Sequence, residues 1–550
     1  MKRTRVAPTD VPAAPLPHAR APDDAGAGVT PGADTGADTG EDAGADAGAD
    51  AAAQARDLAW GGSHELAIEL CTLGLAAARQ DDPARFDLLE LRCESLLALA
   101  RYAEAGNDAA AMLALAQGRS ALQARALVMQ ARGPLRQGRW RAGLAAAERA
   151  LALANDSGDP QVQGLALLTA ADADLRAERN ATALRRSQRA VALYERVNDA
   201  VGLGRAWWMA ANASASLGRR QASAEAAARA AGLARESGDE LGLGNALNVL
   251  SFSHSDIAER LLLLQQADDA FECAGYHDRR AIVRFNLAAA FEELGLYRRS
   301  RREREALRDA ALRVGATSGA AYASLALVKL DTRLGDATAA RRALADYRAL
   351  LTEYADPLAK FNQALAETEL ALLGKEGSRA VRQAGVAVRF ATAQLDASLQ
   401  IGALEALSRA LLAHGDAKAA LRASARATRL HRMQDLGKTD LVQRQALWWQ
   451  HARALAANGR ADDAWAALQQ AHAFLIDAVH NVRDEGLRRS YLNKVLGNRG
   501  IVLDWLREAS RRDVAQARRL EHLRIASDTT EPFKRLVDTG MRLNEPSTAT

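Results

Sequence analysis

The sequence has few aromatic residues, few cysteines and no long apolar run. Phe, Trp and Tyr make up 5% of the 550 residues, and Ala, Leu and Arg dominate. These three residues favour helix over sheet. No segment reaches the roughly 18 apolar residues of a membrane-spanning helix, and the N-terminus lacks the apolar core of a secretory signal peptide. We therefore predict an all-α protein located in the cytoplasm, with no membrane contact.

Motifs that would carry chemistry are also lacking. The three cysteines, Cys71, Cys93 and Cys273, form no CxxC pair, and each lies in a helical pattern. We expect them to be small buried residues rather than a disulfide or a zinc site. The segment at Gly374 and Lys375 lacks the first Gly and the final Ser or Thr of a phosphate-binding loop. We predict no catalytic residue, no metal and no cofactor, and hence no enzyme.

Charge is nearly balanced, at a net +4, but it is unevenly distributed. Residues 21–50 are acidic, contain no Lys or Arg, and include the run GADTGADTGEDAGADAGAD. Such a segment has almost nothing to bury, so we predict that residues 1–50 are a disordered acidic tail. Arginines are scattered over most of the predicted helices rather than clustered. This pattern indicates solvated surface and argues against a nucleic-acid partner.

Two series of turn sequences recur with a period of about 40 residues. The longer loops include NDSGDP at 155–160 and ESGDE at 236–240, and the tight turns include QGRW at 137–140 and LGRR at 217–220. Gly at the tight turn provides the left-handed conformation that ends a helix. Asp, Asn or Ser in the loop can cap the next helix. The shared period predicts repeated helix–turn–helix units.

Within each unit a large residue follows the turn, and small residues follow at positions where the two helices would touch. Examples are Trp140 with Ala150, Tyr102 with Ala105 and Tyr297 with Ser300. This pattern resembles the tetratricopeptide repeat (TPR), in the long-unit form found in bacterial regulators. The resemblance implies a right-handed superhelical solenoid of about ten TPR-like repeats over residues 51–480.

One unit departs from the pattern. Its turn reads SFSHSDIAERLLLL and contains no Gly. His254 and Asp256 could be ligands for a metal there. A capping role for Asp256 at the start of the second helix is the interpretation we favour.

The chain changes character after the repeats. Residues 481–512 are predicted to form capping helices, and residues 513–550 a linker helix with a polar stub. An apolar stripe on that last helix would suit an effector or self-association; it comprises Phe533, Leu536, Val537 and Leu543. The tail is similar to the connector between TPR superhelices and GAF-type sensor domains of bacterial signalling proteins.

The remaining candidate site is the groove that the first helix of each unit would line. Asn side chains can hold an extended peptide backbone, aromatic side chains supply anchoring area, and charges steer association. The predicted groove residues are Arg205, Trp208, Asn212, Asn245, Asn248, Phe285, Lys329, Arg409 and Arg453. The alternative is that these are ordinary packing or solvated positions.

The function that follows is a scaffold with a regulatory or signalling role that binds a protein or peptide ligand in its groove. The alternative is a truncated N-terminal sensor part of a bacterial signalling protein that would continue into GAF and nucleotide-cyclase or kinase domains.

Overall fold

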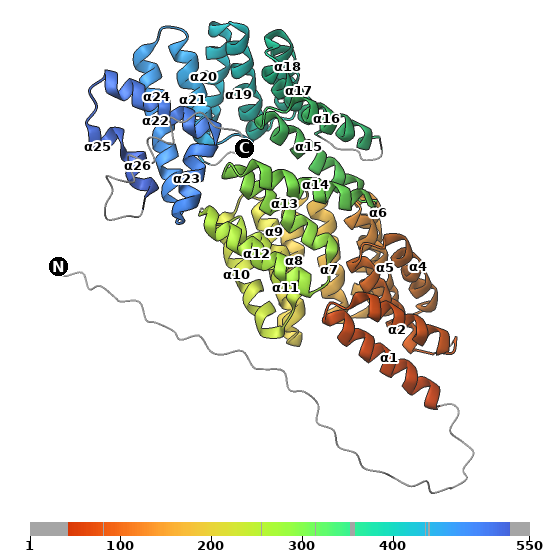
Figure 1. Cartoon of the computed structure of the whole chain (residues 1–550). Helices are drawn as coiled ribbons and strands as arrows, with labels where there is room; N and C mark the ends of the chain where they lie inside the picture. Colours follow the sequence, from red (N-terminus) through yellow and green to blue (C-terminus); the bar gives the residue numbers. More distant parts are fainter. Residues whose placement is uncertain are drawn as a thin grey trace, which may run out of the picture. The chain divides into compact units, whose positions relative to one another are not determined.

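The computed structural model describes residues 42–527, except residues 81, 255, 314, 353–357, 435 and 438–440. In this part of the chain the regular structure consists of helices α1–α26, with no strand (Figure 1). The all-α prediction is therefore confirmed. Contacts divide the chain into two units, Met1–Ala43 and Gly44–Thr550. The second unit is the one described below.

Ten helix pairs fill residues 84–480 and form a TPR-like helical repeat solenoid. The first helices are α3 Ala84–Ala98, α5 Ser120–Arg136, α7 Pro160–Arg176, α9 Ala200–Ser216, α11 Glu240–Ser251, α13 His277–Glu293, α15 Thr317–Arg333, α17 Ala359–Leu373, α19 Ala397–His414 and α21 Arg444–Ala456. The second helices are α4 Tyr102–Leu115, α6 Trp140–Ser157, α8 Asn180–Val197, α10 Arg220–Ser237, α12 Ile257–Cys273, α14 Tyr297–Arg313, α16 Ala337–Leu350, α18 Gly377–Ala393, α20 Ala417–Met433 and α22 Ala461–His480. The predicted period of about 40 residues is confirmed.

The turns inside the units have the predicted chemistry. The turn glycines that follow first helices have positive φ, which side chains disfavour; they are Gly138, Gly218, Gly295, Gly335, Gly415 and Gly459. In the aberrant unit the Asp256 carboxylate accepts a hydrogen bond of 2.9 Å from the Ala258 N–H and so caps α12. The capping interpretation of Asp256 is confirmed.

Small residues lie where the helices of a unit meet. Ala105, Ala150 and Ser300 are buried, as the repeat pattern predicts. First helices of neighbouring units also contact each other, as α5 does with α7 and α9 with α11, whereas second helices of neighbouring units make weaker contacts among the described residues. The first helices therefore lie on the inner side of the curved array.

Trp207 is the large core residue of the fourth unit. It is partly buried and packs against clusters contributed by several neighbouring helices, and the Arg229 guanidinium lies 4.8 Å from its ring centre. We expect Trp207→Ala to lower the free energy of unfolding by about 2–3 kcal/mol, because the cavity left behind cannot be refilled by small neighbours. Denaturant unfolding measures this loss. Met433→Ala, at an exposed position, is the control, and equal midpoints for the two variants would contradict the packing described.

The N-terminal tail prediction needs a correction. Residues 42–50 belong to α1 Asp42–Trp60, which precedes α2 His64–Ala77. Ala52 and Ala55 of α1 are buried in a cluster with Cys71 and Leu88. High helix propensity of alanine, together with this burial, outweighs the Gly and Asp content of the segment. Residues 1–41 lie outside the described part.

The cysteine prediction is confirmed for two of the three residues. Cys71 and Cys93 are buried, whereas Cys273 is exposed. Cys273 is the last residue of α12.

Four helices follow the repeats: α23 Glu485–Lys494, α24 Leu496–Arg511, α25 Gln516–Arg519 and α26 Glu521–Ala526. Tyr491 and Leu492 of α23 are buried in one cluster with the last repeats. The predicted stripe Phe533, Leu536, Val537 and Leu543 lies outside the described residues, so its partner role stays a prediction. None of the described helices combines the length and apolar character that a membrane crossing requires.

Helices far apart in the sequence contact each other at two places in the array. At the first, which we call the first closing contact, the start of α2 meets the loop between α12 and α13, where His64 Nε2 donates to the Ala274 carbonyl at 2.9 Å. At the second closing contact, α23 meets the turn between α13 and α14, where Ser490 Oγ donates to the Leu294 carbonyl at 2.9 Å. Segments about 200 residues apart in sequence are thereby joined.

Candidate functional site: a charged cavity in the first half of the array

A cavity of about 710 Å³ lies among the first helices of the early units. Its walls come from α1, α3, α5, α7, α9 and α11, and the first closing contact adds the start of α13. Six arginines line it: Arg56, Arg125, Arg132, Arg136, Arg205 and Arg279. Eight carboxylates line it as well: Asp87, Glu90, Glu94, Asp159, Asp172, Asp199, Asp239 and Glu240. The cavity is therefore polar, with both charge signs present.

Three of these carboxylates are placed by the repeat itself. Asp159, Asp199 and Asp239 are the N-cap residues of α7, α9 and α11, and each accepts a hydrogen bond from a backbone N–H of its helix. The cap of α11 leaves no room for a side chain three residues later: a Cβ added at Gly242 would lie 2.5 Å from Asp239 Oδ2. The period of the array thus brings one capping aspartate per unit to the same wall.

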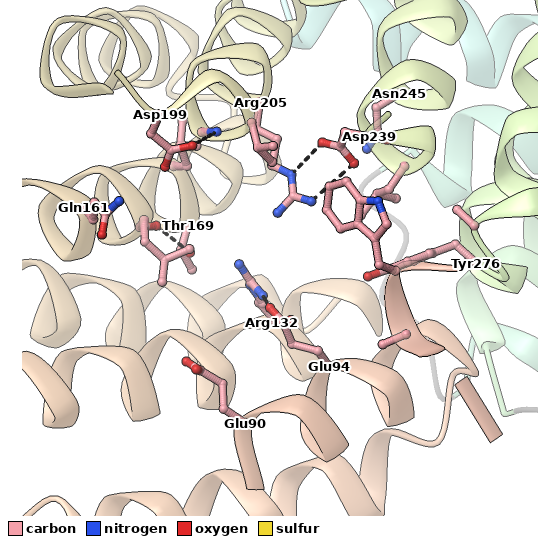
Figure 2. Close-up of a pocket in the computed structure, with 18 of the residues that line it drawn as sticks. Glu90, Glu94, Arg132, Gln161, Thr169, Asp199, Arg205, Asp239, Asn245 and Tyr276 are labelled. Carbon is pink, nitrogen blue, oxygen red and sulfur yellow. Dashed lines mark hydrogen bonds and ion pairs between the residues drawn. The ribbon is translucent and has the colours of Figure 1, made fainter. Parts of the chain in front are cut away.

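Ion pairs hold most of the arginines in the cavity. Arg205 Nε lies 3.1 Å from Asp239 Oδ2, and Arg132 Nη1 lies 2.9 Å from Glu94 Oε1. Figure 2 shows the guanidinium groups of Arg132 and Arg205 pointing toward one another from different helices. Burial alone would lower the pKa of Arg205, but the pair with Asp239 raises it. The ion pairs fix the direction of these two guanidinium groups before any ligand binds.

Arg125 forms a similar pair at the other side of the cavity. Its guanidinium contacts Glu90 and lies 2.9 Å from Asp87 Oδ1. Burial raises the pKa of Glu90, against the pairing with Arg125 that lowers it. A carboxylate in this position depends on its arginine partner to remain ionised.

Arg279 differs from the other arginines of α5, α9 and α13 that line the cavity. Within the described part of the chain it has no ion pair and no hydrogen bond, and its Nε atom is buried without an acceptor. Its guanidinium lies 5.5 Å from the ring centre of Trp208. Burial, followed by the nearby charge of Arg136, lowers the pKa of Arg279. The positive charge at this wall is therefore undercompensated.

The first closing contact forms one side of the cavity. Because the Ala274 carbonyl can only accept, His64 Nε2 carries a proton, and His64 Nδ1 lies 3.2 Å from Ser95 Oγ. Burial lowers the pKa of His64, so its imidazole is neutral. Across the same contact, an Arg136 nitrogen lies 3.2 Å from Asp278 Oδ2.

Two glycines allow this close approach. A Cβ added at Gly62 would lie 2.1 Å from the Cys273 carbonyl oxygen, and one added at Gly275 would lie 2.4 Å from the Gly62 carbonyl oxygen. Both residues also have positive φ. The backbones can meet here because neither residue has a side chain.

The predicted groove residues fall into different places. Arg205, Trp208 and Asn245 line the cavity. Asn212 and Asn248 do not line it: Asn212 Nδ2 donates to the Trp208 carbonyl of its own helix at 3.1 Å, and Asn248 Oδ1 accepts from Asn286 Nδ2 at 2.8 Å. Both side-chain amides are thus engaged within the array.

The other four predicted residues lie on first helices of later units, outside this cavity. The Arg304 guanidinium lies 4.3 Å from the ring centre of Phe285, and that of Arg453 lies 5.1 Å from the ring centre of Trp449. Lys329 is exposed to solvent. These positions face the inner side of the array but do not form one site with Arg205.

Arg409 is the fourth of these residues, and it is already paired. It contacts Glu369, and its Nε lies 2.9 Å from Glu405 Oε1. Burial would lower the pKa of Arg409, but the carboxylates of Glu369 and Glu405 raise it. An arginine bound to two carboxylates has little capacity left for a partner.

Sequence reasoning missed Arg132, Arg136, Tyr276 and Arg279. A local signal existed for the first two, since Arg125, Arg132 and Arg136 recur at helical spacing on one face of α5. Tyr276 and Arg279 enter the cavity only through the first closing contact. Groups of three or more His, Cys, Asp or Glu that could hold a metal ion are absent from the part of the chain that the structure describes.

The fold defines the class as a TPR-like helical repeat protein, with a charged cavity among the first helices of its early units. No family model matches the sequence, and no curated protein matches it. Similar solved structures include a Rap conjugation gene regulator in complex with the Phr* peptide, with 12% identity and a TM-score of 0.39, covering 63% of this chain and 96% of that chain. They also include a Rap protein complexed with competence and sporulation factor (10%, TM-score 0.34, 80% and 99%) and yeast Tom70 (12%, TM-score 0.35, 90% and 95%).

Proposed function

We propose that the protein is a non-catalytic binding scaffold with a regulatory role, and that the cavity holds a short peptide or an extended segment of a protein. The observation that carries this proposal is the way the cavity is built. Successive repeats each contribute charged or amide side chains at equivalent positions, and Trp208 and Tyr276 add aromatic surface. A peptide has the matching features, because its backbone donors and acceptors recur along an extended chain.

Size and charge favour this ligand class over others. A volume of about 710 Å³ lies within the range of roughly 300–1,000 Å³ typical of ligand pockets. The cavity has more carboxylates than arginines, and they would repel the continuous phosphate charge of a nucleic acid. The ion pairs hold charged groups of both signs in fixed directions. Such a lining suits a ligand that has positive and negative charges as well as amide groups.

Trp208 offers the most direct test of this function. We expect Trp208→Ala to weaken peptide binding by about 30-fold or more, as for an aromatic hot spot, with helicity retained. The measurement is affinity selection of a defined pool of short synthetic peptides on the full chain, followed by titration of the selected peptide.

Met433→Ala, exposed on α20, is the control and should bind as the parent does. Equal binding by Trp208→Ala and the parent would place recognition outside the cavity. Absence of any selected peptide from the pool would count against the proposed function itself.

A further inference from the structure

Arg56 and Arg279 are the arginines of the cavity that form no ion pair with the described residues; Arg56 is exposed, whereas Arg279 has a buried nitrogen. Arg125, Arg132, Arg136 and Arg205 each contact a carboxylate of the chain. Arg279 has none among the described residues, and its buried Nε has no acceptor. The residue as a whole is only partly buried, so its other guanidinium nitrogens remain accessible. A cation that is partly removed from water is costly to leave unpaired, so such groups are normally paired. The partner missing here is an anion.

The surroundings of Arg279 describe where that anion would lie. Trp208 covers one side of the guanidinium, at 5.5 Å from its ring centre. Arg136 lies at the same wall, because it contacts Asp278, the residue before Arg279, at 3.2 Å. Arg136 also lies 5.6 Å from the ring centre of Tyr276. Two guanidinium groups and two aromatic rings thus converge beside the first closing contact.

The charges of neighbouring residues favour a small anion with a single negative charge. Asp278 forms an ion pair with Arg136. Asp172 Oδ1 lies 3.1 Å from Arg176 Nε. The carboxylates on the remaining walls would repel a multiply charged ligand. A single carboxylate matches the planar fork of an arginine and adds only one negative charge.

We propose that the cavity binds one carboxylate of its peptide ligand at Arg279, beside Arg136, and that this carboxylate joins α5 to α13 across the first closing contact. The inference rests on the proposed peptide-binding function and names the end of the ligand that is recognised. A ligand bound there contacts both sides of the closing contact, so binding stabilises the closed form.

The carboxylate can come from the peptide C-terminus or from an Asp or Glu side chain. Four matched pools of peptides of about four to six residues, each residue extending ~3.4 Å, separate these sources. Two pools have free C-termini and two are amidated, and within each pair one pool contains Asp and Glu and the other replaces them by Asn and Gln. We expect the full chain to retain peptides from the pools with a carboxylate and to lose them from the amidated, acid-free pool.

Variants of the full chain test the residue. For the selected peptide, Arg279→Gln is expected to weaken binding by about 10- to 100-fold, the loss typical of a charged hydrogen bond, and Arg279→Lys by less. Arg302→Gln, at an exposed position of α14, is the matched control and should bind as the parent does. Without peptide, Arg279→Gln should melt close to the temperature of the parent, because the contact that it loses is the weak one with the Trp208 ring.

The outcomes are distinct. Peptides that bind the parent and Arg279→Gln equally, or an amidated, acid-free pool that binds as well as the others, would overturn the carboxylate site and leave the peptide-binding function standing. A melting temperature of ligand-free Arg279→Gln far below that of the parent would show a structural role instead. No binding from any pool would overturn both proposals.

Discussion

Replacing Gly62 by alanine should destabilise the protein by about 3–5 kcal/mol, far more than the same change at another turn glycine. The added Cβ would lie 2.1 Å from the Cys273 carbonyl oxygen, so the two backbones must separate. Separation breaks the hydrogen bond between His64 and Ala274 and exposes the pair formed by Arg136 and Asp278. The cavity would lose one of its walls with the contact.

Gly218→Ala is the matched control for this change. Gly218 has φ +73°, close to the +80° of Gly62, but nothing lies within 4 Å of its added Cβ. The control therefore includes the backbone strain, about 1–2 kcal/mol, without the clash. Equilibrium unfolding gives both losses, and hydrogen exchange at α2 reports the contact itself. Equal losses from the two variants would mean that the first closing contact contributes nothing to stability.

Acid should weaken the C-terminal helices through two histidines. His472 and His522 are buried, and the His472 ring is stacked on Trp505 with 4.0 Å between ring centres. Both ring nitrogens of His522 and Nε2 of His472 lack hydrogen-bond partners in the described structure. Burial lowers the pKa of His472 to about 3, with a smaller effect of His522, and burial lowers the pKa of His522 to about 4.

The direction in which stability changes with pH follows from these lowered pKa values. An unfolded chain binds protons at each histidine below a pKa of roughly 6.5, whereas the folded protein does not. Stability is therefore complete above that pH and falls as the pH is lowered toward the folded pKa values. The full slope of about 1.4 kcal/mol per pH unit and histidine is reached only below the unfolded pKa, so the loss between pH 6.5 and 5 amounts to about 3 kcal/mol.

Denaturant unfolding at several pH values measures this slope. The variant His472→Phe with His522→Leu keeps the apolar packing and removes both titrating groups, so its slope should be clearly smaller. Replacing exposed His480 by Leu serves as the control and should keep the slope of the parent. Identical slopes in the parent and the double variant would rule out these two histidines as the cause.

Local sequence features predict the repeats well but predict the cavity only in part. Turn glycines, capping aspartates and small contact residues act within a few residues of themselves, so Gly138 or Asp256 can be interpreted without knowing the rest of the chain. Arg205, Trp208 and Asn245 could be found from the same register. Tyr276 and Arg279, which reach the cavity from the other side of the array, could not be found in this way.

The sequence does not show which distant units meet, because this depends on the pitch of the array. Small differences in helix packing add up over five units before the start of α2 meets Ala274, and no short pattern encodes that sum. The sequence around Tyr276 and Arg279 therefore gives no sign that these residues line a cavity. The acidic run at residues 42–50 was misjudged for a related reason, since burial of Ala52 and Ala55 against α2 and α3 is a tertiary effect.

The two closing contacts change how the array should come apart. In an open repeat array each unit touches only its neighbours, so the ends fray first. Here both contacts lie around α13 of the sixth unit: Ala274 in the loop before α13 holds α2, Asp278 at its start holds α5, and Leu294 at its end holds α23. Terminal helices are thereby tied to the middle of the chain, and they lose their contacts only when that unit also opens. We expect unfolding in large cooperative blocks, with α2 and α23 protected to a similar degree as α13, rather than gradual loss from the ends.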